Sequence, residues 1–202
     1  MLITFEGIDG CGKSTQIDLL KSYLDKKGVT YNVFREPGGT DLSEKIRNLL
    51  LHDSIGMDPV TEMLLFSSAR SELISEKVIP LLEAGNVVIL DRFYDSTTAY
   101  QGYGRQSLPI DQILTLNRIA SHGLVPGLTF YLRISPDEAS RRTDGSDKDR
   151  MEKSGISFFE KVSAGYDELE KKEKRFVTLD AKLTPDQIHA KIREKVDPLL
   201  NL

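Results

Sequence analysis

"MLITFEGIDGCGKSTQIDLL" at residues 1–20 joins an apolar run to a stretch of helical periodicity through a corner with three glycines in six residues. Gly7, Gly12, Lys13 and Ser14 have the G-x-x-x-x-G-K-[ST] spacing of a phosphate-binding loop (P-loop). The glycines let consecutive backbone N–H groups curve around an anion, and the following helix adds the positive end of its dipole. The stretch therefore predicts a strand, a P-loop and a helix, in that order.

The loop residues themselves indicate how a polyphosphate would be held. We expect Lys13 to reach the β- and γ-phosphates of a nucleoside triphosphate and the Ser14 hydroxyl to ligate Mg²⁺. The competing interpretation, a glycine-rich turn with a surface lysine, is disfavoured because the motif lies between a strand and a helix, where its mechanism requires it. The expected nucleotide-binding residues are Gly7, Ile8, Asp9, Gly10, Cys11, Gly12, Lys13, Ser14 and Thr15.

The rest of the chain repeats the alternation of strand and helix. Short apolar runs predict strands at 1–6, 31–35, 86–91, 128–133 and 175–180. Amphipathic stretches predict helices at 13–27, 41–51, 59–84, 109–122, 136–142, 157–172 and 185–200. Several strands, with "VVIL" at 87–90 the clearest, are too apolar to leave one face in water. An α/β fold with a parallel sheet covered on both faces is therefore predicted.

Composition limits what the chain can bind. Its 202 residues suit one domain with a single core. Lys and Arg number 27 against 31 Asp and Glu, and this net charge of −4 disfavours binding to nucleic acid or to an anionic membrane. The single cysteine, Cys11, excludes an internal disulfide and fits a reducing compartment. No apolar run approaches the roughly 18 residues of a membrane span, so we expect a cytoplasmic protein.

Charged residues follow two of the predicted strands. "VVILDRF" ends in Asp91 and Arg92, and "FREPGGT" contains Arg35 and Glu36. Ligands of doubly wound sheets bind beyond the carboxyl ends of the strands. A carboxylate at 91 could hold Mg²⁺ or its waters, and a guanidinium at 92 could clamp a second phosphate. Each dipeptide taken alone could instead be a surface ion pair.

Phe66 and Arg70 in "LLFSSAR" lie four residues apart, on one face of a predicted helix. An aromatic plane beside a planar fork of donors suits a flat heterocycle. Taken alone, such a pair is more often a core phenylalanine beside a salt-bridged arginine.

Residues 140–155, "SRRTDGSDKDRMEKSG", depart from the alternating pattern. A single Met stands among charges, glycines and serines, so we expect the segment to be too polar to pack on a core. Its composition predicts a solvated loop, and its three arginines also allow a functional interpretation.

These pieces occur in the order typical of thymidylate kinases, which the chain resembles over nearly its whole length. The motifs that carry the resemblance are "FEGIDGCGKSTQ", "REPGGT", "LLFSSAR", "DRFYDSTTAYQGYGR", "DRMEK" and "FFEKVSAGY". The resemblance implies a P-loop kinase fold with a five-stranded parallel sheet, one domain over residues 1–202 and a homodimer. It also implies an enzyme that transfers the γ-phosphoryl of ATP to dTMP with Mg²⁺, giving dTDP and ADP.

The same resemblance assigns roles around the acceptor. Phe66 matches the residue that stacks on thymine, Arg70 the one that reaches its O4, and Asp9 a carboxylate near the acceptor sugar. The other matches are Arg35, Arg47 and Arg92 around the acceptor phosphate, Glu36 and Asp91 near the metal and sugar, Thr97 and Gln101 at the thymine edge, and Tyr100 against a 2′-hydroxyl.

A mobile lid at about residues 140–155 is implied as well, and it would supply arginines because the P-loop has none. Arg141 and Arg150 match the lid positions best and Arg142 less securely. The family commonly has "RGE" before its "DR", where this chain has "DGSDKDR", so Lys148 is an alternative cation. The expected catalytic set is Lys13, Asp9, Arg92, Arg141 and Arg150.

Other P-loop proteins remain as alternatives. A deoxynucleoside kinase or another nucleoside monophosphate kinase is the nearest, and a non-catalytic nucleotide-binding protein would bind ATP without releasing ADP. A GTPase switch needs an N-K-x-D type guanine reader, which the sequence lacks. Many motor and transport ATPases place Glu after the Asp of this strand, and here Arg92 follows Asp91.

Overall fold

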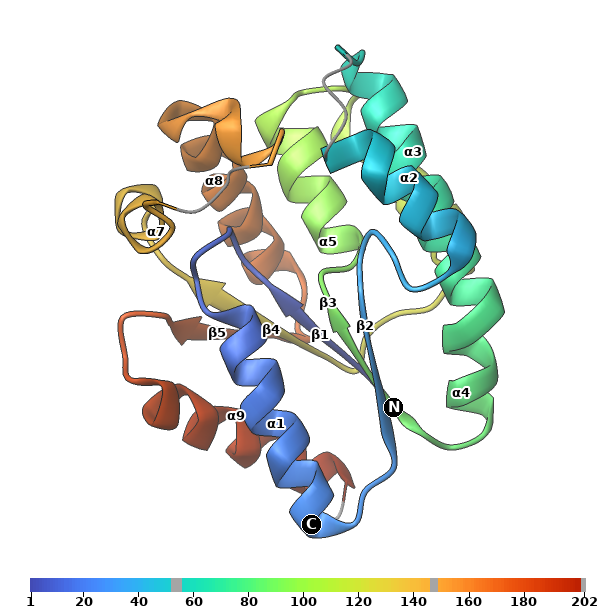
Figure 1. Cartoon of the computed structure of the whole chain (residues 1–202), viewed down its shortest axis with the longest axis vertical. Coiled ribbons are helices and arrows are strands. Elements are labelled where there is room, and N and C mark those ends of the chain that lie inside the picture. The colour runs from blue at the N-terminus through green and yellow to red at the C-terminus, as the bar shows by residue number, and fades with distance from the viewer. Residues whose placement is uncertain (52–55, 146–148, 201–202) are drawn as a thin grey trace.

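The computed structural model describes residues 1–51, 56–145 and 149–200. Five parallel strands form one sheet in the order β2–β3–β1–β4–β5 (Figure 1). They are β1 (Leu2–Glu6), β2 (Tyr31–Arg35), β3 (Val87–Asp91), β4 (Leu128–Arg133) and β5 (Phe176–Asp180). The predicted α/β fold with a five-stranded parallel sheet is confirmed.

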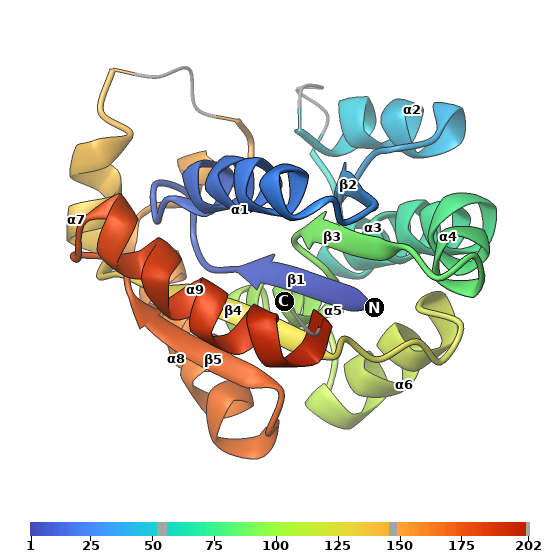
Figure 2. The same ribbon diagram turned by 90° about the horizontal axis from the view of Figure 1, so that it is seen from below.

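Helices cover both faces of this sheet. Figure 2 shows α1 and α9 on one face and α6 and α8 on the other. The helical elements are α1 (Lys13–Lys27), α2 (Asp41–Leu51), α3 (Pro59–Leu73), η1 (Ile74–Val78), α4 (Ile79–Glu83), α5 (Tyr94–Thr97), η2 (Thr98–Gly104), α6 (Ile110–Ala120), α7 (Pro136–Arg142), η3 (Glu152–Ser154), α8 (Ile156–Lys172) and α9 (Pro185–Leu200). In the described part of the chain, no helix combines the length and apolarity needed to cross a bilayer.

The central strands are apolar on both faces because each face meets helices. Ile3 and Ile89 join a buried cluster that includes the inner faces of α1 and α9. Leu2 and Val88 join a second cluster with residues of α3 and η1. The uniformly apolar "VVIL" therefore lies in an interior strand, as expected.

Two helical segments differ from the prediction. The single helix expected at 59–84 contains a π-helical turn, η1, just before Pro80, whose missing N–H and bulky ring disfavour regular α-helical bonding. α5 and η2 were not predicted, because Thr, Ser and Gly favour other conformations. Tertiary packing stabilises them. The Tyr103 ring of η2 packs so closely on Gly165 of α8 that a Cβ at position 165 would lie 2.8 Å from a ring atom of Tyr103.

The carboxyl ends of β1, β2 and β3 lie side by side. Asp91 pairs with Phe5 on one side and with Arg35 on the other. The Glu36 N–H donates to the Asp91 carbonyl at 2.9 Å, and the Arg92 N–H donates to the Phe5 carbonyl at 2.9 Å. The register therefore brings the P-loop after β1, the "RE" after β2 and the "DR" after β3 to one edge of the sheet.

Candidate active site

The P-loop leaves the start of α1 open to a ligand. Gly10 (φ 81°) and Gly12 (φ 99°) have left-handed backbones that non-glycine residues rarely adopt. Gly12 provides no side-chain cap, and the first intrahelical bond runs from Gln16 N to Gly12 O at 3.2 Å. The preceding amides therefore have no acceptor within the helix. They border a cavity of about 360 Å³ that is lined by residues of the loop and by the ends of β2 and β3.

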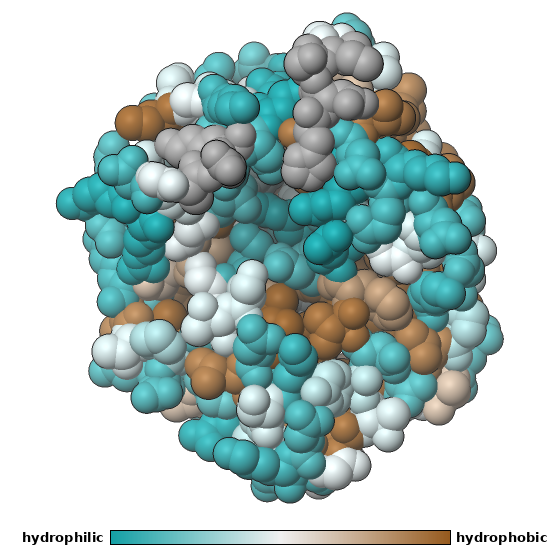
Figure 3. All heavy atoms as spheres, viewed as in Figure 1, coloured by the Kyte–Doolittle hydropathy of each residue, from teal (hydrophilic) through white to brown (hydrophobic). Residues whose placement is uncertain are grey.

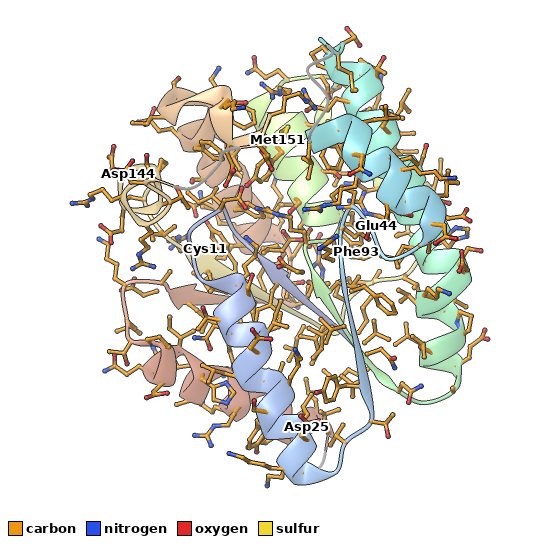
Figure 4. All side chains as sticks on the ribbon, viewed as in Figure 1. Cys11, Asp25, Glu44, Phe93, Asp144 and Met151 are labelled. Carbon is orange, nitrogen blue, oxygen red and sulfur yellow. The ribbon has the colours of Figure 1, made fainter. Side chains whose placement is uncertain are left out.

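The Lys13 side chain lies inside this loop. Its Nζ donates to the Gly7 carbonyl at 3.0 Å and to that of Ile8 at 3.4 Å, and the side chain is only 7% exposed. The Ile8 and Cys11 side chains are buried, so these two residues offer mainly backbone to a ligand (Figure 4). Burial also raises the pKa of the Cys11 thiol above its ordinary value, which favours an inert filler.

Two oxygens at the mouth of the loop suit a Mg²⁺ ion. Ser14 is exposed at the first turn of α1 and Asp91 ends β3, and both line the P-loop cavity. The Asp91 Oδ1 atom is buried and accepts no hydrogen bond from the described residues. A hydroxyl and a carboxylate beside a phosphate site form the donor set that Mg²⁺ prefers. The residues present therefore fit the ion.

Asp9 and Arg92 form the bridge between the P-loop and the helices opposite. Arg92 Nη2 lies 2.6 Å from Asp9 Oδ1, and its guanidinium lies 5.0 Å above the Tyr100 ring centroid. Burial alone would raise the pKa of Asp9, but the charges of Arg92 and Lys13 outweigh it and lower that pKa to about 2. Asp9 is therefore an ionised acceptor across the neutral pH range.

Two further arginines lie around the same cavity. Arg35 pairs with Glu44 Oε2 at 3.1 Å, and Glu44 also accepts the Gly39 N–H at 2.9 Å. Arg47 donates to the Pro37 carbonyl at 2.9 Å. Both arginines line the P-loop cavity, as does Arg92. These three guanidinium groups, together with that of Arg142, therefore border one space that suits an anion.

The second cavity adjoins the first and is lined in part by an aromatic ring. Its lining includes Phe66, Arg70 and Thr97. Arg70 is held rigidly: Nε donates to Glu36 Oε2 at 2.7 Å and Nη2 to Thr97 Oγ1 at 3.0 Å. Its Nη1 is buried without an acceptor among the described residues. Burial raises the pKa of Glu36 to about 7, against the charge of Arg70. The unpaired Nη1 is therefore a donor left for a ligand.

The two cavities form one continuous site. Asp9, Glu36, Arg47 and Arg92 line both of them. Figure 3 shows hydrophilic surface gathered around a hollow in the upper part of the face seen in Figure 1. A ligand in the second cavity can thus place an anionic group among the arginines, facing the P-loop.

The expected lid arginines have three different environments. Arg141 is 73% exposed and pairs with Glu138 Oε2 at 2.6 Å, and Arg150 pairs with Glu62 Oε2 at 2.6 Å. Arg142 alone of the three lines the P-loop cavity, and its Nη2 donates to the Ala181 carbonyl at 3.0 Å. The alternative cation, Lys148, lies outside the described residues.

The expectation that residues 140–155 are too polar to pack on a core was wrong at Met151. This side chain is 5% exposed and belongs to the main buried cluster. Figure 4 shows Met151 directed into the molecule and Asp144 at its outer edge. Asp149 makes this possible, because its Oδ1 accepts the N–H groups of Met151 and Glu152 at 2.7 and 2.8 Å. A short turn thus carries one apolar side chain inward.

Two buried carboxylates beside the site, Glu6 and Glu62, are not predicted from the sequence. Glu6 accepts the Phe93 N–H at 2.7 Å and so holds the turn that follows Arg92, whose φ is 71°. Glu62 accepts from Gln101 and two arginines. Its position four residues before Phe66 and eight before Arg70 places it on their face of α3, a signal that the spacing did contain.

Comparisons with known proteins agree with this geometry. The family model described as thymidylate kinase matches residues 5–192. Proteins named thymidylate kinase include one from Chlorobaculum parvum that is 48% identical, covering 98% of this chain and 96% of the relative. One from Thermoanaerobacter sp. is 45% identical, covering 98% of both chains, and one from Chlorobium luteolum is 49% identical, covering 94% of both. This chain therefore belongs to the thymidylate kinase family.

Proposed function

We propose that this protein is a thymidylate kinase that transfers the γ-phosphoryl group of ATP to dTMP, giving dTDP and ADP. The observation that carries the proposal is the continuity of the two cavities, which share Asp9, Glu36, Arg47 and Arg92. One cavity offers open helix amides and a lysine, and the other offers an aromatic ring and an unpaired guanidinium nitrogen. Family membership supports the same activity.

The donor side holds ATP by its phosphates. The amides of the P-loop would bind the phosphate oxygens, and Lys13 would exchange its Gly7 and Ile8 carbonyls for the β- and γ-phosphates. Ser14 and Asp91 would hold Mg²⁺, directly or through water. The ion would neutralise charge on the β- and γ-phosphates during transfer.

The acceptor side orients dTMP. Phe66 would stack on thymine, Arg70 Nη1 would donate to O4 and Thr97 and Gln101 would contact the base edge. Arg35, Arg47 and Arg92 would hold the acceptor phosphate opposite the P-loop. The Tyr100 hydroxyl lies 3.5 Å from Asp9 Oδ2, where the two would border the sugar and leave no room for a 2′-hydroxyl.

Transfer then depends on position and on charge neutralisation. Phosphoryl transfer passes through a loose transition state whose equatorial oxygens need fixed cations. Lys13 and Arg92 supply two of them. Arg142 is the lid arginine that this arrangement already brings to the cavity. Arg141 and Arg150 remain proposals, and each would first have to leave Glu138 or Glu62. A closing lid at 140–155 would exclude water.

We also propose an assembly, which the resemblance implies, and a cellular setting, which the composition implies. The chain would act as one domain in a cytoplasmic homodimer that takes no nucleic acid or membrane as partner. Exposed Leu64 on α3 and Leu114 and Ile119 on α6 provide apolar surface for a second copy. These two helices pack together, so the apolar side chains lie on one part of the surface.

A phosphate-acceptor assay tests the function. ADP release would be followed with ATP and Mg²⁺ against dTMP, dUMP, dCMP, AMP and thymidine. dTMP is expected to be the best acceptor, and dUMP to be weaker by about 10- to 200-fold because it lacks one methyl group. Cytosine presents a donor to Arg70 Nη1 and is expected to be rejected more strongly.

Each other result identifies a different protein. A preference for thymidine would mean a nucleoside kinase, and a preference for AMP or dCMP another monophosphate kinase. ATP binding without ADP release for any acceptor would refute catalysis.

A further inference from the structure

Glu62 contacts Gln101, which lines the second cavity, but does not line the cavity itself. Its side chain on α3 is 1% exposed. Oε1 accepts Gln101 Nε2 at 2.9 Å and, more weakly, Arg105 Nε at 3.4 Å. Oε2 lies 2.6 Å from Arg150 Nη1. The carboxylate is thus surrounded by three donors, two from η2 and its C-terminal end and one from the turn at Arg150.

This environment fixes the orientation of the Gln101 amide. A carboxylate between two guanidinium groups offers acceptor lone pairs and no proton, so only the NH₂ end of Gln101 can face it. Gln101 is 2% exposed and lines the second cavity, which leaves no freedom to turn without losing a buried bond. Within the described part of the chain, nothing donates to the Gln101 Oε1 atom.

The lining of the cavity therefore offers one donor and one acceptor that the described residues leave unpaired. Arg70 Nη1 is the unpaired donor and Gln101 Oε1 the acceptor. Thymine and uracil carry an acceptor at O4 beside a donor, N3–H, and match the pattern. Cytosine carries a donor at N4 beside an acceptor, N3, and is opposite at both atoms.

We infer that Glu62, which does not touch the substrate, is a specificity-determining positioning residue that holds Gln101 so that its Oε1 accepts the N3–H of thymine. The inference rests on the proposed function and adds a residue that acts only through another. Arg70 reads the base at position 4 and the Glu62–Gln101 pair reads it at position 3, so dCMP is rejected twice.

When Glu62 is replaced by glutamine, we expect the Gln101 amide to turn over. The new side chain keeps one oxygen, and Arg150 at 2.6 Å is a closer donor than Arg105 at 3.4 Å. The oxygen therefore turns to Arg150, and the new NH₂ group faces Gln101. Gln101 must then turn its own oxygen toward this NH₂, and its NH₂ group faces the base. The NH₂ group can then donate to N3 of cytosine and repels the N3–H of thymine.

The test is the ratio of kcat/KM for dTMP to kcat/KM for dCMP. Glu62→Gln is expected to lower this ratio at least about tenfold, mainly through dTMP, while the KM for ATP stays within about twofold. dTMP remains preferred because Arg70 is unchanged. Glu62→Asp keeps the negative charge for Arg150 but withdraws the oxygen from Gln101, and it is expected to lower the ratio in the same direction. If the glutamine variant does not fold, the ratio measured for Glu62→Asp tests the inference in its place.

Two controls separate positioning from a general effect on the fold. Arg105→Met removes the longest Glu62 contact and retains the Gln101 bond, so its ratio is expected to equal that of the parent. Glu62→Gln added to Gln101→Leu is expected to change the ratio no further than Gln101→Leu alone, because Glu62 acts through Gln101.

The outcomes distinguish the two claims. A parent enzyme active on dTMP, with a ratio unchanged in both Glu62 variants, would overturn this inference and leave the function standing. Additive effects in the double variant would also overturn it. A parent that fails to phosphorylate dTMP would overturn the function and this inference together.

Discussion

Glu6→Gln is the substitution whose effect on stability can be worked out most fully from the structure. The Glu6 side chain is completely buried at the end of β1. Its Oε1 accepts the Phe93 N–H at 2.7 Å, and its Oε2 accepts the Ser96 and Tyr166 hydroxyls at 2.6 and 2.8 Å. Glutamine has nearly the same shape and no charge, so the substitution removes the titration of this group and little packing.

The sign of the pH dependence follows from the pKa of Glu6. Burial, assisted by the nearby charge of Asp95, raises this pKa from 4.5 to about 7, against the hydrogen bond from Ser96, the charge of Arg92 and the hydrogen bond from Tyr166. The folded state therefore binds more protons than the unfolded state between these values. The contribution of Glu6 to stability is fully present below pH 4.5 and is lost as the pH rises through 7. The loss amounts to about 3 kcal/mol.

Urea unfolding of the parent and of Glu6→Gln between pH 4.5 and 8 measures this loss. The free energy of unfolding of the parent minus that of the variant is expected to fall by about 3 kcal/mol across the range. Taking the difference cancels other groups, such as Glu36, that titrate in both proteins.

Glu44→Gln is the matched control for a carboxylate outside the core. The Gly39 N–H lowers the pKa of Glu44 against the effect of burial, and Arg35 lowers it further. The contribution of Glu44 to stability is therefore lost only as the pH falls below about 4.5, and the parent-minus-Glu44→Gln difference is expected to stay nearly constant between pH 4.5 and 8. A parent-minus-Glu6→Gln difference that stays constant with pH would refute the assignment of Glu6 as a buried carboxyl with a raised pKa.

Three substitutions address catalysis. Lys13→Ala is expected to lower kcat about a hundredfold or more with the circular dichroism spectrum unchanged, and activity within tenfold of the parent would argue against the P-loop role. Phe66→Ala is expected to raise the KM for dTMP about tenfold or more and to spare ATP, and equal effects on both would return Phe66 to the core. Arg142→Ala is expected to lower kcat by a larger factor than it changes the KM for ATP. In single-turnover assays it is also expected to slow transfer more than Arg141→Ala does. A larger loss in Arg141→Ala or Arg150→Ala would give the lid role to that residue instead.

The parts of the fold set by local pattern could be predicted from the sequence. α1, α2, α7 and α9 have the predicted bounds, and each strand agrees to within one residue at its start. The P-loop was predictable because its mechanism depends on a fixed spacing of adjacent residues. α5 and η2 were not, because packing against α8 outweighs the low helix propensity of their Thr and Gly residues.

Contacts between distant segments limited the prediction of the site. Arg150 and Glu62 form an ion pair although they lie far apart in the sequence, so no local sequence pattern predicts the pair. The same holds for Glu6 and the turn at Phe93. A buried carboxylate is a polar residue in an apolar stretch, and only the folded structure supplies the donors that make its burial tolerable.

The place of β1 in the sheet also has a consequence for synthesis on the ribosome. β1 is the first of these five strands to be synthesised, yet it pairs with β3 and β4 on its two sides. At roughly 5–20 residues per second, translation reaches the end of β4 only several seconds to about half a minute later. One edge of β1 can pair as soon as β3 is made, but the other edge stays open to wrong partners until β4 emerges. Because β5 is made last, the sheet must grow outward from β1 and β3 during translation, and a holding chaperone would bind the nascent N-terminal half.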